Sequence, residues 1–141
     1  MCEKTPGAYE TEIEIVVRST EIDVNSHVNN AKYLEYLEWS REEWWEQRGL
    51  DYLTLKQMNV VTVVVKISAE YKREAVQNDR LRISARLAEV GNTSLKMTQE
   101  ITNQRGEQVL QSEVVIVTVH PVTHRPVPVP LAIRQYLSPP S

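Results

Sequence analysis

The chain carries a single long pattern with helical period, and strand-like patterns surround it. Residues 9–18 alternate between apolar and charged side chains, which is typical of a half-buried strand. Residues 30–48 instead repeat with helical spacing and are followed by Gly49, as an amphipathic helix often is. Its predicted inner face is formed by Leu34, Leu37, Arg41 and Trp44, flanked by Tyr33 and Trp45. A further helical turn fits within residues 50–59.

Strands alone are predicted between the second helical turn and the tail. The alternating segments are 60–74, 79–90, 93–103 and 108–120. In the first of them, the side chains expected to share one face are Val61, Val63, Val65, Ile67, Ala69 and Tyr71. Gly91 and Gly106 mark hairpins. The last strand is apolar on both faces from Val114 to Val117, which indicates a central position. A short helix is predicted at Leu131 to Leu137 in the proline-punctuated tail.

This order predicts an α+β fold in which a five-stranded, mainly antiparallel sheet surrounds one long helix. We find no internal repeat or linker, so residues 1–141 are expected to form a single domain. A lone sheet around one helix would leave its other face exposed. We therefore expect the protein to form oligomers.

Composition excludes several classes of partner and compartment. The net charge of −3 provides neither a basic field for nucleic acid nor a polybasic membrane patch. We see no apolar run long enough to span a membrane, and the opening residues lack the layout of a secretion signal. The single cysteine, Cys2, provides no disulfide framework, which favours a reducing cytoplasm.

A polar cluster immediately precedes the long helix. Asp23, Asn25 and His27 stand at two-residue spacing, and Asn29 or Asn30 can cap the helix that follows. The first N–H groups of a helix lack intrahelical acceptors and carry partial positive charge, so they can stabilise an oxyanion. An acid, an amide and an imidazole beside them can supply acid–base chemistry. The alternative is structural: caps for the helix and a histidine satisfied within a turn.

Three segments carry a resemblance to a known family. The stretch "DVNSHVNNAKYLEYLEW" resembles the D-x-x-x-H-V-N-N-x-x-Y signature of hotdog-fold acyl thioesterases, in the 4-hydroxybenzoyl-CoA thioesterase superfamily. It is most similar to the long-chain acyl-CoA and plant acyl-ACP branches. The stretch "AEYKREAVQNDRLRI" resembles a conserved segment of the acyl-ACP enzymes, and "VVIVTVHPVTHRPVPVP" resembles the family's last strand and tail.

The resemblance implies roles for individual residues. Asp23 matches the family's nucleophile or general base, and Asn25 and His27 match groups that position and activate the attacking species. Glu74 matches an acid that activates water. The residues implied to bind substrate at the helix start are Val28, Asn29, Asn30 and Tyr33. Ala75 replaces the family's cysteine, so no thiol nucleophile is available at that position.

The resemblance also implies an activity and an assembly. The expected reaction is hydrolysis of an acyl thioester of coenzyme A or acyl carrier protein, with no metal and no cofactor. The family pairs two protomers through their sheets, so a homodimer or a dimer-of-dimers tetramer is expected, with ligands at the protomer interface. The alternatives are an acyl-thioester hydratase or dehydratase and a non-catalytic acyl-thioester binding module.

Two further groups of residues have both a structural and a functional interpretation. Trp44 and Trp45 are expected to pack in the core or an interface, and one of them could line an acyl tunnel. The candidates for contacts to coenzyme A phosphates are Arg73, Arg80, Arg82 and Arg125. Alternation on one strand favours a solvated face for Arg80 and Arg82.

Overall fold

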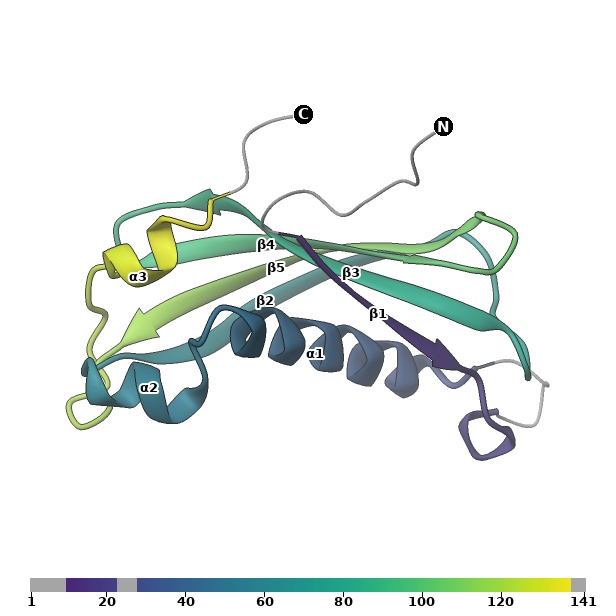
Figure 1. Ribbon diagram of the computed structural model, residues 1–141, viewed down its shortest axis with the longest axis horizontal. Helices are drawn as coiled ribbons and strands as arrows, with labels where there is room; N and C mark the ends of the chain where they lie inside the picture. Colours follow the sequence, from purple (N-terminus) through teal and green to yellow (C-terminus); the bar gives the residue numbers. More distant parts are fainter. Residues whose placement is uncertain (1–9, 23–27, 138–141) are drawn as a thin grey trace.

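The computed structural model describes residues 10–22 and 28–137, which form one sheet and three α-helices (Figure 1). The strands are β1 (Glu10–Val16), β2 (Val61–Tyr71), β3 (Arg80–Val90), β4 (Ser94–Thr102) and β5 (Gln108–Val119). The helices are α1 (Asn30–Gln47), α2 (Tyr52–Gln57) and α3 (Leu131–Arg134), and a 3-10 turn covers Ser19–Glu21. The predicted elements are thus confirmed, although the tail helix is shorter than expected.

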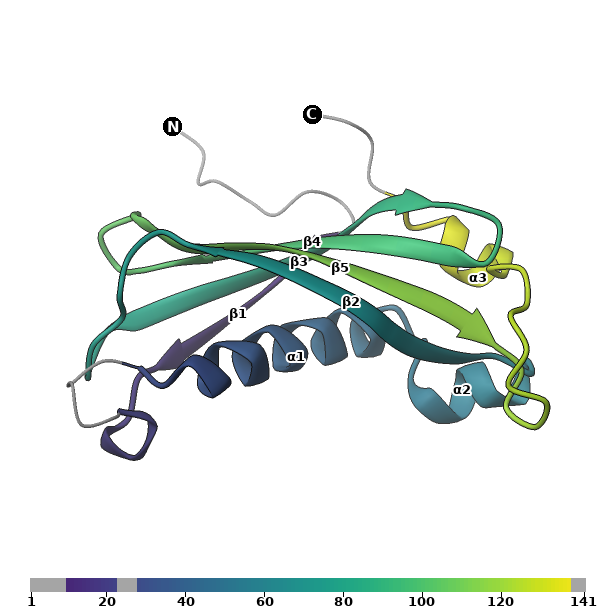
Figure 2. The same ribbon diagram turned by 180° about the vertical axis from the view of Figure 1, so that it is seen from behind.

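All strand pairs are antiparallel, and the order across the sheet is β1-β3-β4-β5-β2. The predicted central position of β5 is confirmed, because it lies between β4 and β2. β1 and β2 are the two edges, and β2 is the edge nearest the viewer in Figure 2. The long helix α1 lies along one face of the sheet and contacts β1 and β3 (Figure 1).

The inner face of α1 differs from the predicted one at one position. The buried residues of the helix are Tyr33, Tyr36, Leu37, Ser40, Arg41 and Trp44. The prediction that Leu34 lies on the inner face is wrong, because its side chain is 44% exposed. Tyr36 is buried on that face instead. The helix is turned toward β1, where the Gln47 side chain lies 3.2 Å from the hydroxyl of Thr11. Leu34 therefore lies on the opposite flank, away from the covered part of the sheet.

The prediction that alternate residues from Val61 to Tyr71 all share one face of the sheet is also wrong. The register of β2 against β5 shifts between Val64 and Lys66, which is a β-bulge. Val63 pairs with Val117, whereas Ile67 pairs with the fully buried Val114. Because one extra residue reverses the alternation, Val61 and Val63 share one face of the sheet, and Ile67, Ala69 and Tyr71 share the face that carries α1.

A row of small and polar residues crosses the sheet beneath the middle of α1. Directly paired across the strands are Thr11, Ala85, Gln99, Ser112 and Ala69. The hydroxyl of Ser40 donates to the carbonyl of Ile83 at 3.2 Å, which fixes the helix close to β3. The row separates two apolar clusters, one around Trp44 and one around Tyr33 and Leu37.

Arg41 is a buried cation within this row. Its guanidinium donates from Nη1 to Oε1 of Gln99 at 2.9 Å, and Nε2 of Gln99 donates to the carbonyl of Leu37 at 2.8 Å. Arg41 is 7% exposed, and within the described residues no carboxylate forms a salt bridge with it. Burial lowers the pKa of Arg41, while the charges of Glu38 and Glu42 oppose this shift. Gln99 is therefore the group that compensates a buried charge.

We predict that Gln99→Leu lowers the free energy of unfolding by about 1.5–3 kcal/mol, since it removes a hydrogen bond to a charged group and leaves that group buried. Urea unfolding followed by circular dichroism measures the change. The matched control is Gln111→Leu on the exposed side of β5, which should change stability by less than about 0.5 kcal/mol. Equal effects of the two substitutions would contradict the role of Gln99.

Candidate active site at the start of the long helix

The segment predicted to be catalytic lies between two fixed points. Asp23, Asn25 and His27 fall outside the described residues. The residues that flank them, Ile22 and Val28, form an isolated antiparallel bridge. Val28 is buried and begins the approach to α1. The chain on either side of the predicted cluster is thus fixed close to the start of α1.

Most backbone N–H groups at this helix start already have acceptors. The occupied groups are those of Val28, Asn29, Ala31 and Lys32. Asn29 is the N-cap, because its Oδ1 accepts from Ala31 N at 2.8 Å. The N–H of Asn30, the first helical residue, has no acceptor among the described residues. Of the three backbone groups predicted to bind substrate, those of Val28 and Asn29 are thus occupied, and that of Asn30 stays a candidate within the part of the chain that the structure describes.

The loop after β2 is tied to the same helix start by two hydrogen bonds. The carbonyl of Ala75 accepts from Val28 N at 3.0 Å. The N–H of Ala75 donates to the hydroxyl of Tyr33, also at 3.0 Å. Ala75 is fully buried, so the position where the family carries a cysteine is packed against α1. These bonds place the neighbouring Glu74 at the end of the helix that carries Val28 and Tyr33.

The electrostatics of Tyr33 report the same proximity. Burial is the main cause that raises the pKa of Tyr33, and the hydrogen bond from Ala75 opposes it. The charge of Glu74 raises this pKa further. The Tyr33 ring also meets that of Tyr71 at the end of β2, with centroids 5.5 Å apart. Tyr33 is 3% exposed, so its hydroxyl acts here as an acceptor for the loop.

Asp79 was not singled out by sequence reasoning, although it belongs to a segment that carries the resemblance. Its side chain is buried and accepts from Val76 N through Oδ2 and from Gln104 through Oδ1, both at 3.0 Å. Its carbonyl accepts from Val17 N at 2.9 Å. Asp79 thus closes the turn that follows Glu74 and Ala75. The signal for it was an aspartate shortly before a predicted strand, a common turn residue.

The candidate phosphate ligands do not gather at the helix start. Arg73 lies 3.4 Å from Glu107 in an exposed ion pair. Arg80 and Arg82 line a pocket of about 310 Å³ together with Glu14. Their strand neighbours Leu81 and Ile83 are buried against α1, so these arginines occupy the opposite face of the sheet. Their role with coenzyme A stays a prediction.

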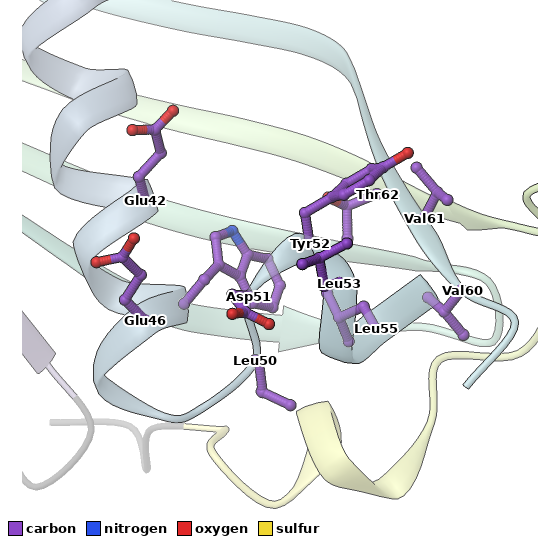
Figure 3. Close-up of a pocket in the computed structure, with 11 residues that line it drawn as sticks. Glu42, Glu46, Leu50, Asp51, Tyr52, Leu53, Leu55, Val60, Val61 and Thr62 are labelled. Atoms are coloured by element: carbon purple, nitrogen blue, oxygen red, sulfur yellow. The ribbon is translucent and has the colours of Figure 1, made fainter. Parts of the chain in front are cut away.

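A larger pocket, of about 400 Å³, lies near the end of α1 (Figure 3). Trp45 lines it, whereas Trp44 is fully buried in the core. The remaining wall comes from α2 and the first residues of β2, and three carboxylates also line the pocket, those of Glu42, Glu46 and Asp51. Of the two tryptophans considered for an acyl tunnel, Trp45 is therefore the one that lines this pocket.

Within residues 10–22 and 28–137, we find no group of three or more His, Cys, Asp or Glu side chains placed to hold a metal ion. Within the same ranges, none of the helices is long and apolar enough to cross a membrane.

Comparison with known proteins identifies the family. A family model described as the thioesterase-like superfamily matches residues 17–137. The protein belongs to this superfamily. The fold expected from the signature is confirmed as well, since the sheet and helix superpose on a 1,4-dihydroxy-2-naphthoyl-CoA thioesterase from Synechocystis with a TM-score of 0.82. That structure is 15% identical, and the match covers 91% of this chain and 95% of the other.

Two relatives are more similar in sequence. The long-chain acyl-CoA thioesterase FadM of Escherichia coli (strain K12) is 37% identical over 97 residues, which cover 69% of this chain and 73% of FadM. The acyl-CoA thioester hydrolase YbgC of Escherichia coli O6:H1 is 30% identical over 111 residues, which cover 79% of this chain and 83% of YbgC.

Proposed function

We propose that the protein hydrolyses acyl thioesters, with acyl-CoA as the first candidate substrate and acyl carrier protein as the second candidate carrier. Membership of the thioesterase-like superfamily and the named activities of FadM and YbgC support the reaction type. The observation that carries the proposal is the N–H of Asn30, which has no acceptor among the described residues and lies beside the loop of Glu74.

The proposed mechanism depends on oxyanion stabilisation. The N–H of Asn30 and the positive end of the helix polarise the thioester carbonyl. In a direct route, the Asp23 carboxylate attacks the carbonyl carbon, the C–S bond breaks, and water hydrolyses the resulting anhydride. In a shared-water route, Glu74 or His27 removes a proton from a water that attacks instead, and Asn25 positions it. In both routes a thiolate leaves, so strong acid assistance is unnecessary.

We further propose that a homodimer is the active form. The edge strand β2 exposes Val63, Val64, Val65 and Ile67, and α1 does not cover it. An unpaired apolar edge is a template for a further strand. A second copy supplies that strand through antiparallel pairing about a twofold axis. The single domain over residues 1–141 and the cytoplasmic location suggested by the lone cysteine stay predictions.

The reaction is tested by incubating the purified protein with an acyl-CoA series and an acyl carrier protein series in the presence of a thiol-reactive dye. We expect thiol release, and we expect Asp23→Asn to lower kcat by about 10²–10⁴-fold, as the loss of a positioned base or nucleophile does. If thiol release is lost in Asp23→Asn but not in Glu74→Gln or His27→Ala, the result supports the direct route. If thiol release is also lost in Glu74→Gln or His27→Ala, the result supports the shared-water route. A change in the acyl chain with the thioester intact would indicate a hydratase, and binding without turnover would indicate a binding module.

The oxyanion role of Asn30 can be isolated by Asn30→Pro. Proline is favoured at the first helical position, and compared with alanine it lacks the backbone N–H. The preceding Asn29, at φ −62° and ψ 138°, already has the extended conformation that a residue before proline adopts. We expect kcat to fall about 10²–10³-fold while the unfolding midpoint is nearly unchanged. Asn30→Ala retains the N–H and is the control. A proline variant as active as the alanine variant would remove Asn30 from the mechanism.

The dimer is tested at β2 by Ile67→Asp. Pairing about a twofold axis brings two such carboxylates into one buried interface, where like charges destabilise the pair. We expect light scattering to show a dimer or tetramer for the wild type and a monomer for the variant, with loss of thiol release. The control, Val122→Asp, changes a residue that is 77% exposed outside the sheet and should leave the mass unchanged. A monomeric wild type with full activity would overturn the proposal.

A further inference from the structure

The pocket of about 310 Å³ that Arg80 and Arg82 line has no part in the mechanism above. Its walls come from β1, β3 and the hairpin between β4 and β5, and its volume falls within the range of small-ligand pockets, roughly 300–1,000 Å³. This hairpin and the start of α1 lie at the same end of the molecule (Figure 1), but the two arginines lie on the other face of the sheet. The pocket lining includes neither Asn30 nor Glu74. The pocket is therefore distinct from the proposed active site.

The two arginines are the cations of this pocket. Arg80 and Arg82 are two positions apart on β3, so their side chains share one face and start about 6.5–7 Å apart. Among the described residues, neither guanidinium donates a hydrogen bond or forms an ion pair, whereas Arg73 and Arg105 on the neighbouring loops both lie against Glu107. The pocket thus offers two neighbouring guanidinium groups to an anion from solution.

A phosphate group fits these two guanidinium groups better than a carboxylate does. A phosphate monoester presents three terminal oxygens, so it can accept hydrogen bonds from two guanidinium groups at once. A carboxylate presents two oxygens in one plane, and a single guanidinium already matches them. The spacing of Arg80 and Arg82 therefore favours a phosphate that lies between them.

Glu14 adds a requirement for donor groups on the ligand. It lies directly opposite Arg82 in the pairing of β1 with β3, and among the described residues no ion pair joins the two side chains. Its carboxylate repels a bare anion but accepts hydrogen bonds from hydroxyl groups. A ligand that combines a phosphate with hydroxyl groups therefore matches both signs of charge in the pocket.

One wall of the pocket is ordered by hydrogen bonds within the protein. In the hairpin, Oδ1 of Asn103 accepts from the N–H groups of Arg105 and Glu107, each at 3.0 Å. Oε1 of Gln104 accepts from Arg80 N at 2.9 Å, which joins the hairpin to the start of β3. Because these groups are fixed before a ligand arrives, less conformational entropy is lost on binding.

The same wall is linked to the loop after β2. Nε2 of Gln104 donates to Oδ1 of Asp79 at 3.0 Å, and Oδ2 of Asp79 accepts from Val76 N at the same distance. The neighbouring Ala75 is bonded to Tyr33 in the first turn of α1. A ligand packed against Gln104 is therefore connected to this loop by a continuous set of hydrogen bonds.

We infer that this pocket binds a small phosphate monoester that carries hydroxyl groups, and that the bound ligand stabilises the loop after β2. Arg80 and Arg82 bind the phosphate, and Glu14 accepts from a hydroxyl group. The site is separate from that of the thioester, so the inference goes beyond the proposed hydrolysis and does not depend on it. The nucleotide end of coenzyme A has the same chemistry, and a competition experiment distinguishes it from an independent ligand.

Calorimetric titration with glycerol 3-phosphate tests the phosphate contacts. We expect the wild type to bind it, and we expect Arg80→Gln and Arg82→Gln each to raise Kd about tenfold or more, since each removes charge-assisted hydrogen bonds. The matched control is Arg86→Gln, on the same strand and face but outside the pocket lining. At about 0.15 M ionic strength charges more than about 8 Å apart are largely screened, so this control should change Kd by less than about twofold.

Three outcomes of this titration would overturn the inference. The first is the absence of binding to the wild type, and the second is an equal rise of Kd in Arg86→Gln, which would indicate a general effect of charge. The third is tighter binding of citrate than of glycerol 3-phosphate, because the pocket would then select carboxylates.

The role of Glu14 is tested with two ligands that share the phosphate and differ in hydroxyl groups. The wild type should bind glycerol 3-phosphate more tightly than methyl phosphate, and Glu14→Gln should lower this ratio of affinities about tenfold, since it weakens the acceptor and removes the repulsion. The control is Glu12→Gln, on the same strand and outside the pocket lining, which should leave the ratio unchanged. An equal ratio in Glu14→Gln and the wild type would contradict the assigned ligand class.

Competition with a non-hydrolysable thioether of coenzyme A identifies the source of the phosphate. We expect protein saturated with the thioether to bind glycerol 3-phosphate with an unchanged or lower Kd, since the two ligands occupy different sites. If the thioether instead displaces glycerol 3-phosphate, and Arg82→Gln weakens the thioether, then the nucleotide end of the substrate occupies the pocket and the separate site is disproved.

Amide hydrogen exchange tests the link to the loop after β2. At ten times its Kd, glycerol 3-phosphate should slow the exchange of the Val76 N–H by about tenfold, the limit for a ligand that binds only the closed loop. The Leu55 N–H, which is bonded to Asp51 in α2, is the control and should be unaffected. Unchanged exchange at Val76, or equal slowing at Leu55, would show that the bound ligand does not act on this loop.

Discussion

The hydrogen bonds that join Arg41, Gln99 and the carbonyl of Leu37 fix the position of α1 on the sheet. They lie midway along the helix, between an apolar cluster around Tyr33 and another around Trp44. Apolar contacts alone are non-directional and tolerate sliding, whereas these bonds define one register of the helix relative to β4. These two hydrogen bonds at the centre of α1 therefore help to fix the positions of both helix ends. The helix start can then meet the loop after β2, and the helix end can meet α2.

The helix start depends on segments that are distant in sequence. Ala75 is bound both to Val28, before the helix, and to Tyr33, in its first turn. Asp79 closes the loop from the other side. The bond from Val28 to Ala75 and the bonds that Glu21 and Asn29 accept occupy the neighbouring N–H groups, so among the described residues of the helix start the N–H of Asn30 is the one without an acceptor. The scaffold around the helix start thus limits which backbone donors remain for the proposed oxyanion role.

The element order followed from the sequence because it depends on local patterns, whereas the site predicted from the signature stays a prediction. Period-two and helical spacing predicted each strand and the long helix, and the signature predicted the family. The predicted inner face of α1 was wrong at Leu34. The rotation of the helix toward β1 depends on tertiary contacts, such as that between Gln47 and Thr11. The bulge at Val65 was missed, since it appears only in the pairing with β5. The hydrogen bond from Arg41 to Gln99 joins residues 58 positions apart, and spacing carries no signal for it. The occupied N–H groups at the helix start were likewise beyond sequence reasoning, which left three equal candidates.

The two edges of the sheet are chemically unequal, and this limits growth of the assembly. The outer edge β1 presents the exposed carboxylates of Glu12 and Glu14, whereas β2 presents valines and a bulge. Charged side chains on an edge strand oppose the addition of another strand. When two copies join through β2, both edges that remain free are β1 edges and carry the same charge. In the proposed dimer, pairing through β2 therefore ends after one step, because the charged β1 edges oppose growth of the sheet into a fibre.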